Sequence, residues 1–302
     1  MTKEFWFIKS DVARLVLSLV VLSIVASADA QSKRALIVGI SDYMQVSQDS
    51  WSSIHGANDA ELIASVLEKQ GFCCTKICNK KATAKRIRKE LGALAASCKP
   101  GDEVYLHFSC HGQPFEDMNG DEEDGWDEAI VPYDALMTFQ QGVYEGESHL
   151  TDDELHDYFQ KIRSAVGSNG YLWVVIDACH AGNTYMGDEE EEDVVFCRGT
   201  KKGFSSQGKS FHPRINASGQ FQIPQQQGLA DIVILEACRS YQSNYEINQD
   251  GTYYGPLSYY ISQVLAKQNL SKDIGWVLEV KNKMAADGRL SRQNMVYETS
   301  IK

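Results

Sequence analysis

An uninterrupted apolar run, Trp173-Val174-Val175-Ile176, ends abruptly at Asp177-Ala178-Cys179-His180. A strand that carries large apolar side chains at every position is buried on both faces, as the central strands of parallel sheets are. Residues 171–177 therefore predict a central strand of an α/β sheet. Because ligands of such sheets bind beyond the carboxyl ends of the strands, we expect Cys179 to lie at a functional edge.

A second run of the same kind, residues 102–112, ends in Ser109-Cys110-His111-Gly112. A thiol attacks carbonyl carbon effectively only when a neighbouring base or positive charge helps to form the thiolate. Two strand ends that carry Cys179 and His111 therefore predict a nucleophile and its base. The alternative is that Cys179 is merely a small buried apolar side chain.

Strand and helix patterns alternate along the rest of the chain. Such alternation predicts a parallel sheet with right-handed crossover connections and helices on both faces. The expected strands are residues 34–40, 72–77, 102–111, 171–177, 231–237 and an edge strand at 294–299, and the expected helices are 57–70, 83–97, 151–166, 255–268 and one after Ser271.

The first 30 residues are typical of a signal peptide. Lys3, Lys9 and Arg14 precede an apolar run at residues 15–25 that is too short to span a membrane comfortably, and Ala28-Asp29-Ala30 has the form of a cleavage site. We expect export, cleavage before Gln31 and no stable membrane insertion of the mature chain. An uncleaved membrane anchor is the alternative.

The net charge and the cysteine content indicate which partners and which covalent cross-links to expect. A net charge of −12 argues against nucleic acid as a partner, because phosphates require a basic face. Eight cysteines in an exported chain could form disulfides, but 302 residues can bury a core without them. One pairing is considered as an inhibitory bond, between Cys110 and Cys179.

An acidic loop at residues 116–128 half resembles a calcium-binding loop. Asp117, Asn119, Asp121 and Glu128 occupy ligand places, but Glu122 stands where the tight turn requires glycine, and no helices are expected beside it. The loop is therefore not an EF-hand. A less regular calcium site and a solvated acidic loop both remain open.

Beyond the Cys179 strand, residues 187–193 are almost entirely acidic, whereas residues 194–230 contain no acid. Glycine, serine, glutamine and proline are frequent in this second stretch, which is typical of a flexible linker. The basic residues that it carries include Arg198, Lys201, Lys202 and Lys209.

Three motifs together resemble the caspase-like cysteine peptidases, in particular their bacterial metacaspase-like branch: His107-Phe108-Ser109-Cys110-His111-Gly112, the acidic loop that runs into residues 124–132, and Asp177-Ala178-Cys179-His180-Ala181-Gly182. The resemblance implies a caspase-like fold with a mostly parallel, six-stranded central sheet. It also implies a larger subunit-like part at about 33–186, a linker at about 187–228 and a smaller part at about 229–302.

The resemblance assigns roles to single residues. His111 matches the family's base, Cys179 its nucleophile, and His180 a second, noncatalytic histidine. Asp177 and Ser109, and less securely Asp59, match positions that line the pocket for the residue before the cut. Asp177 also lies two residues before Cys179, on the same side of the strand. Such a pocket would favour Arg or Lys and reject Asp, because like charges repel strongly when they are desolvated.

The expected activity is therefore hydrolysis of protein or peptide bonds after Arg or Lys, through an acyl-enzyme on Cys179. Backbone N–H groups of Gly112 and Cys179 are expected to stabilise the oxyanion. Self-cleavage is expected in the basic linker, after Arg198, Lys201, Lys202 or Lys209. The chemistry needs no cofactor, but Asp152 and Asp153 match a family calcium site that Asp127 could complete, so calcium is a candidate activator.

Other interpretations remain at this point. The chain could be a catalytically silent caspase-like binding module, a caspase-like peptidase of different specificity, or another Cys-His acyl-transfer enzyme. The presence of both Cys179 and His111 argues against the silent module.

Overall fold

The computed structural model describes residues 31–46, 50–180, 196–212 and 220–301. The expected signal peptide and parts of the linker lie outside these residues. Among the described residues, no helix is both long enough and apolar enough to cross a membrane.

A seven-stranded sheet forms the centre of the domain, in the order β2-β1-β3-β7-β9-β12-β8. The first five of these strands run parallel, and β12 runs antiparallel to β9. The α/β fold predicted from the sequence is confirmed. The short strand β8 pairs with β12, so the expected six strands become seven and residues 296–299 are not the sheet edge. The strands are β1 Lys33–Gly39, β2 Cys73–Cys78, β3 Glu103–Ser109, β7 Tyr171–Asp177, β8 Gln220–Gln222, β9 Asp231–Glu236 and β12 Val296–Thr299.

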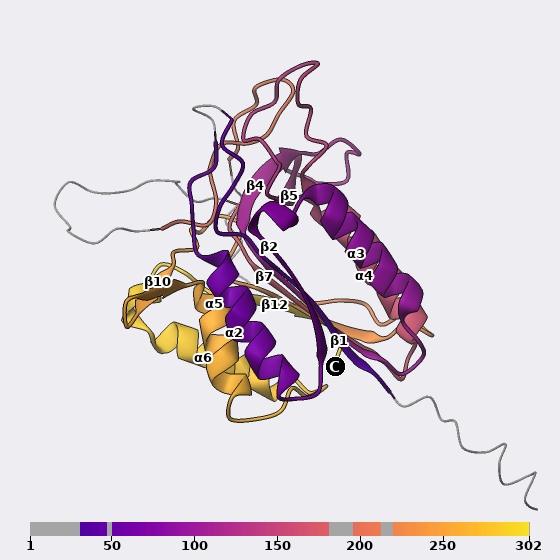
Figure 1. Cartoon of the computed structure of the whole chain (residues 1–302). Helices are drawn as coiled ribbons and strands as arrows, with labels where there is room; N and C mark the ends of the chain where they lie inside the picture. The colour runs from indigo at the N-terminus through magenta and orange to yellow at the C-terminus, as the bar shows by residue number, and fades with distance from the viewer. Residues whose placement is uncertain (1–30, 47–49, 181–195, 213–219, 302) are drawn as a thin grey trace, which may run out of the picture. The chain divides into compact units, whose positions relative to one another are not determined.

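Helices cover both faces of the sheet (Figure 1). Helices α2, α5 and α6 pack on one face, and α3 and α4 pack on the other. Thr83 and Thr151 accept hydrogen bonds from backbone N–H groups in the first turns of α3 and α4, as helix-capping residues do. The helices are α2 Gly56–Glu68, α3 Ala84–Ser97, α4 Asp152–Val166, α5 Pro256–Leu265 and α6 Gly275–Ala286, with 3₁₀ turns at Asn79–Lys81 and Gly288–Leu290.

Strand β7 is buried on both sides, which is why its apolar run is continuous. Val174 packs in the layer beneath α3 and α4, whereas Trp173 and Val175 pack in the layer beneath α2, α5 and α6. All three side chains are almost completely inaccessible to solvent. This burial fixes the strand and thereby the position of the residues that follow it.

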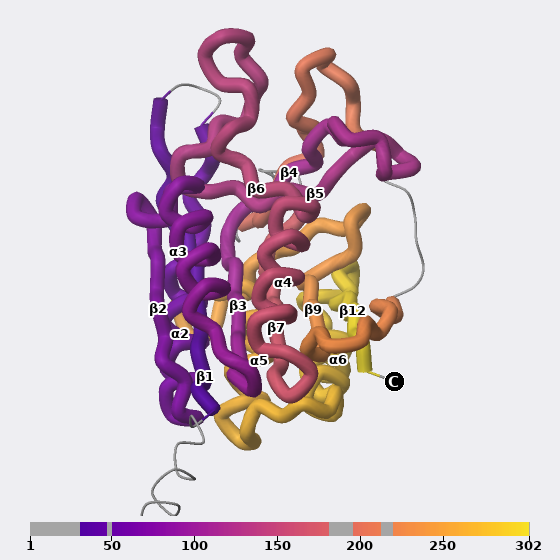
Figure 2. Tube along the Cα trace, turned by 90° about the vertical axis from the view of Figure 1, so that its right-hand side faces the viewer, coloured from indigo at the N-terminus to yellow at the C-terminus, as the bar shows by residue number. Residues whose placement is uncertain are grey.

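Loops and short strands gather beyond the carboxyl ends of the parallel strands (Figure 2). A small antiparallel sheet, β4-β5-β6, lies there, and a two-stranded hairpin, β10-β11, follows β9 in the chain. The strand expected over 102–111 ends at Ser109, and His111 begins β4 instead of closing β3. The bounds are β4 His111–Glu116, β5 Trp126–Val131, β6 Leu150–Thr151, β10 Ile247–Gln249 and β11 Thr252–Tyr254.

Candidate active site

Two neighbouring strand ends bring the predicted nucleophile and base to one edge of the sheet. Strands β3 and β7 pair in parallel register, with Ser109 opposite Asp177. His111 and Cys179 each follow two residues later in the chain. Both side chains are fully buried, so neither is exposed to bulk water.

The imidazole of His111 is held in one orientation. Its Nε2 lies 2.9 Å from the carbonyl oxygen of Ser52, and its ring packs against both Tyr43 and Trp51, each with its ring centroid 4.9 Å away. Because a carbonyl can only accept, Nε2 carries the proton and Nδ1 has a free lone pair. Among the described residues this buried Nδ1 has no hydrogen-bond partner.

Burial lowers the pKa of His111 to about 4, although the Ser52 carbonyl and nearby negative charge partly oppose this. The ring is therefore neutral near pH 7 and can accept a proton. The structure thus holds a neutral His111 ring, whose lone pair is on Nδ1, at the carboxyl ends of the central strands.

The thiol of Cys179 donates to the carbonyl oxygen of Gln242 at 3.0 Å. The thiol of Cys238 donates to the same oxygen at 3.5 Å. None of the eight cysteines, all of which lie in the described residues, forms a disulfide, so the structure contains no disulfide bond between Cys110 and Cys179. Cys110 is buried, and this burial raises the pKa of its thiol.

A segment of the chain itself, residues 196–200, crosses this edge and is joined to its neighbours by isolated β-bridges. The backbone N–H of Arg198 donates to the carbonyl of Asn244 at 3.0 Å, and that of Glu246 donates to Phe196 at 2.9 Å. Cys197 and Tyr245 form an antiparallel bridge between them. The segment is therefore bound by main-chain hydrogen bonds, as an extended peptide is when it adds to a strand.

The carbonyl oxygen of Arg198 lies between two backbone donors. The N–H of Cys179 is 3.0 Å from it, and the N–H of Gly112 is 3.1 Å from it. These are the two groups that the sequence analysis named for an oxyanion hole. A Cβ atom on Gly199 would overlap the carbonyl oxygen of Cys179, so only glycine allows this close passage.

The guanidinium of Arg198 fills a buried acidic pocket. Its Nη1 lies 2.7 Å from Asp59 and 3.7 Å from Asp177, and donates to Ser109 Oγ at 2.5 Å. Its Nε and Nη2 lie 3.0 and 2.7 Å from Glu246 Oε1. The side chains of all four charged residues are fully buried. The structure thus brings Asp59, Ser109 and Asp177 together around one cation.

Charges in this pocket depend on one another. Burial raises the pKa of Asp59 to about 7, even though Arg198 opposes the shift. Burial also disfavours the charged guanidinium, but the carboxylates of Asp59, Glu246 and Asp177 outweigh it and raise the pKa of Arg198. Asp177 additionally accepts hydrogen bonds from Ser258 and Asn244, which fix its position.

Glu246 was not found by sequence reasoning. It belongs to no motif and follows β9 by ten residues, just before β10. Tyr43 and Trp51, which hold His111, were missed for the same reason. Only the three-dimensional fold brings these residues to the ends of β3 and β7.

The three lysines of the linker lie elsewhere. Lys201 and Lys202 are exposed, and the Lys202 ammonium donates to Thr138. Lys209 pairs with Glu116 at 2.6 Å. Of the four predicted self-cleavage positions, the structure brings only Arg198 to Cys179.

The histidine after the nucleophile contacts a different group. His180 Nδ1 lies 3.3 Å from Glu128 Oε2. Burial disfavours the charged ring, but Glu128 outweighs this effect and raises the pKa of His180 to about 9. His180 is therefore a charged partner of Glu128, in contrast to the neutral His111.

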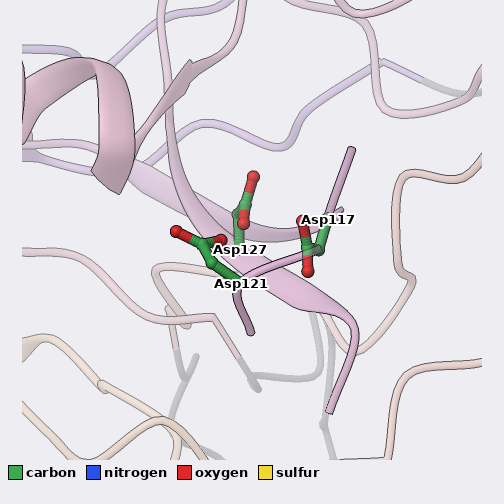
Figure 3. Close-up of side chains that lie close together, drawn as sticks. All are labelled: Asp117, Asp121 and Asp127. Atoms are coloured by element: carbon green, nitrogen blue, oxygen red, sulfur yellow. The ribbon is translucent and has the colours of Figure 1, made fainter. Parts of the chain in front are cut away.

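The acidic loop forms a compact carboxylate cluster (Figure 3). Carboxylate oxygens of Asp117, Asp121 and Asp127 lie within 4.8 Å of one another. The buried Oδ1 of Asp127 has no partner among the described residues, and burial together with neighbouring carboxylates raises the pKa of Asp127 to about 7. Such oxygens suit calcium.

The predicted calcium ligands are only partly brought together. Asp127, Asp152 and Asp153 line one cavity of about 540 Å³. However, Asp152 accepts a hydrogen bond from the Glu128 backbone, and Asp153 accepts one from Asn119. The closest carboxylate group joins Asp127 to Asp117 and Asp121, two residues that the sequence analysis placed on the calcium-like loop.

The fold, with Cys179 and His111 at the carboxyl ends of its central strands, agrees with one known family. The caspase domain family model matches residues 32–301, and the chain belongs to this family.

Curated relatives include Metacaspase-1 of Mycosarcoma maydis, 25% identical, which aligns over 77% of this chain and 62% of its own length. Metacaspase-1B of Aspergillus fumigatus is 26% identical over 59% of this chain and 46% of its own length. Metacaspase-2 of Arabidopsis thaliana is 33% identical over 50% of this chain and 34% of its own length. The chain thus spans less than two thirds of each of these relatives.

A solved structure has a similar fold. The crystal structure of a protein from Geobacter sulfurreducens superposes with a TM-score of 0.61 at 18% identity, and the match covers 90% of this chain and 94% of that one. At this identity the likeness supports the fold alone.

Proposed function

We propose that this chain is an exported cysteine endopeptidase that cleaves after Arg or Lys and that first cuts its own chain after Arg198. The placement of Arg198 carries this proposal. Its guanidinium occupies an acidic pocket while its carbonyl oxygen accepts from Gly112 and Cys179. A substrate residue before a cut requires both contacts at once.

The neutral His111 accepts the thiol proton of Cys179 on Nδ1, and the sulfur attacks the carbonyl carbon of Arg198. Negative charge develops on the carbonyl oxygen, where the two backbone N–H groups stabilise it. His111 then returns the proton to the nitrogen of Gly199, and the peptide bond breaks. Water hydrolyses the resulting thioester and frees Cys179 for another substrate.

Three buried carboxylates explain the choice of substrate. Asp59, Asp177 and Glu246 surround the Arg198 guanidinium, and an acidic side chain in this place would add a fourth negative charge in a desolvated site. A basic side chain is therefore selected and Asp, which caspases proper take, is rejected. The fork of a guanidinium suits the pocket better than the single charge of Lys.

The uncut chain blocks its own cleft. Arg198 is 0% exposed and leaves no room in the acidic pocket for another basic residue. Cleavage between Arg198 and Gly199 separates the larger part from the smaller part and releases Arg198 from its covalent tether on one side. The uncut chain is thus a precursor, and it becomes active when this bond is cut.

Peptide cleavage by the processed protein tests the function directly. Three reporter peptides, which differ only in their last residue (Arg, Lys or Asp), are tested with the processed protein and with the Cys179→Ala variant. We expect cleavage after Arg and Lys, none after Asp, and none by the variant. Cleavage after Asp would contradict the acidic pocket, and activity in the variant would contradict the nucleophile.

Export follows from the residue pattern of the first 30 residues. Protein recovered outside the cytoplasm should begin at Gln31, which N-terminal sequencing checks. Its substrates there are proteins or peptides with accessible Arg or Lys.

We also propose that calcium binds at the acidic loop, with Asp117, Asp121 and Asp127 as carboxylate ligands. The fit rests on the buried Oδ1 of Asp127, which has no hydrogen-bond partner in the described part of the chain, because such an oxygen needs a cation or a proton. Bound calcium would neutralise the clustered charge and order the loop that leads into β5. Asp152 and Asp153 line the same cavity as Asp127 and would lie near the bound calcium ion.

Replacing Asp127 with Asn should weaken calcium binding about tenfold or more, because affinity depends on the number of charged ligands. Titration of calcium into the uncut Cys179→Ala chain measures the effect. Asp124→Asn, on the same loop but outside the cluster, is the control and should bind normally. Equal affinity in both variants would place the cation elsewhere.

A further inference from the structure

A pair of aromatic rings surrounds the residue two positions before Arg198. The Phe196 ring meets His55 edge-on, with centroids 4.7 Å apart, and meets Tyr253 edge-on at 4.9 Å. His55 and Tyr253 stack on each other at 5.0 Å. Edge-to-face contacts of this kind are attractive beyond the area that they bury.

This aromatic notch, formed by His55 and Tyr253, is built from fixed elements. His55 immediately precedes α2, and Tyr253 lies in β11. The carbonyl of Tyr253 accepts a hydrogen bond from Asn58, within α2, at 3.1 Å. The two rings are therefore joined by contacts that do not depend on Phe196.

The notch is also joined to the acidic pocket. Glu246, which holds the Arg198 guanidinium, accepts from the backbone N–H of His55 at 2.7 Å and lies 2.5 Å from its Nδ1. Side chains at alternate positions of an extended strand point to the same side, so Phe196 and Arg198 reach this surface together. One bound segment therefore places Phe196 in the aromatic notch and Arg198 in the acidic pocket.

We propose that His55 and Tyr253 form a second specificity site, which selects an aromatic side chain two residues before the basic one. The preferred substrates then have the form aromatic-x-Arg. This proposal rests on the proposed function, and it deepens it by naming the class of sequence that is cut. Phe196-Cys197-Arg198 is the chain's own example.

Matched tripeptide reporters test the notch in the processed enzyme. Acetyl-Phe-Ala-Arg and acetyl-Ala-Ala-Arg carry the same fluorogenic leaving group, and the ratio of their kcat/KM values is the measurement. A ratio cancels the fraction of active enzyme, so poor folding of a variant cannot imitate the result. We expect Phe to be preferred about tenfold, given the value of aromatic contacts.

Tyr253→Ala should bring this ratio close to one, whereas Tyr253→Phe should keep it, because the contact uses the ring. The matched control is Tyr254→Ala, since Tyr254 neighbours Tyr253 but packs against Tyr259 instead of Phe196. The control should retain the ratio of the unmodified enzyme.

Two results would overturn the notch while leaving the peptidase intact: equal cleavage of both reporters, or a Phe preference that survives Tyr253→Ala. Failure to cut any Arg reporter would instead overturn the proposed function, and the notch with it.

Self-cleavage gives a second readout. Phe196→Ala should slow the cut after Arg198 about tenfold, and Phe196→Tyr should not.

Discussion

Glutamine in place of Arg198 is expected to slow cleavage of the bond between residues 198 and 199 by about 1,000-fold. The variant removes the guanidinium from a pocket where the side chains of Asp59, Asp177 and Glu246 are fully buried. Removing one partner of a buried charge group costs about 3–5 kcal/mol, and about 4 kcal/mol corresponds to this factor in rate. The scissile carbonyl would lose its placement together with the side chain.

A time course of chain cleavage, followed by intact mass, measures this effect. Arg198→Lys should be cut at an intermediate rate, since an ammonium restores the charge but not the fork. Lys201→Gln and Lys202→Gln are the matched controls and should be cut normally, because both lysines lie outside the pocket. A normal rate in Arg198→Gln, or a loss in the lysine variants, would contradict the assignment of the cut.

The sequence was sufficient for the parts of the molecule that hydrophobic burial determines. Strand β7 was predicted with its observed bounds, because a run that is apolar at every position is compatible only with burial on both faces. In a parallel sheet the carboxyl ends of all strands lie at one edge, although the order of the strands is left open. The edge that carries Cys179 and His111 could therefore be expected from the residue pattern alone.

Other parts depend on contacts between residues far apart in the chain. Nothing local distinguishes Arg198 from Lys201 or Lys202, and only the folded chain selects it by carrying it across the ends of β3 and β7. Strand β8 has three residues, too few for a periodic pattern. Its pairing with β12 is set by the fold.

The residues of the acidic pocket also divide into those that the sequence indicates and those that only the fold reveals. Asp177 and Ser109 lie beside the motifs and could be named from sequence, whereas Glu246 could not. Yet the shortest distances from the terminal nitrogens of Arg198 to a carboxylate are those to Asp59 and Glu246, both 2.7 Å, while Asp177 is 3.7 Å away. The carboxylate that sequence indicated most clearly is thus not one that makes the closest ionic contact.

Glu246→Gln is therefore expected to lower kcat/KM for Arg reporters about 100-fold or more, from the loss of about 3 kcal/mol of buried ionic interaction. Lys reporters should lose much less. Glu246 receives the Nε and Nη2 donors of a guanidinium, which Lys lacks, whereas Asp59 lies where a single terminal charge could reach. The Arg-to-Lys ratio should fall accordingly.

Steady-state assays of paired Arg and Lys reporters measure this ratio within one preparation, which removes differences in folding among variants. Glu145→Gln, in an exposed loop, is the control and should leave the ratio unchanged. If both reporters lost activity equally, Glu246 would act by holding His55 and the segment at residues 244–246 in place. A selective loss for Arg would instead make Glu246 the residue that distinguishes a guanidinium from an ammonium.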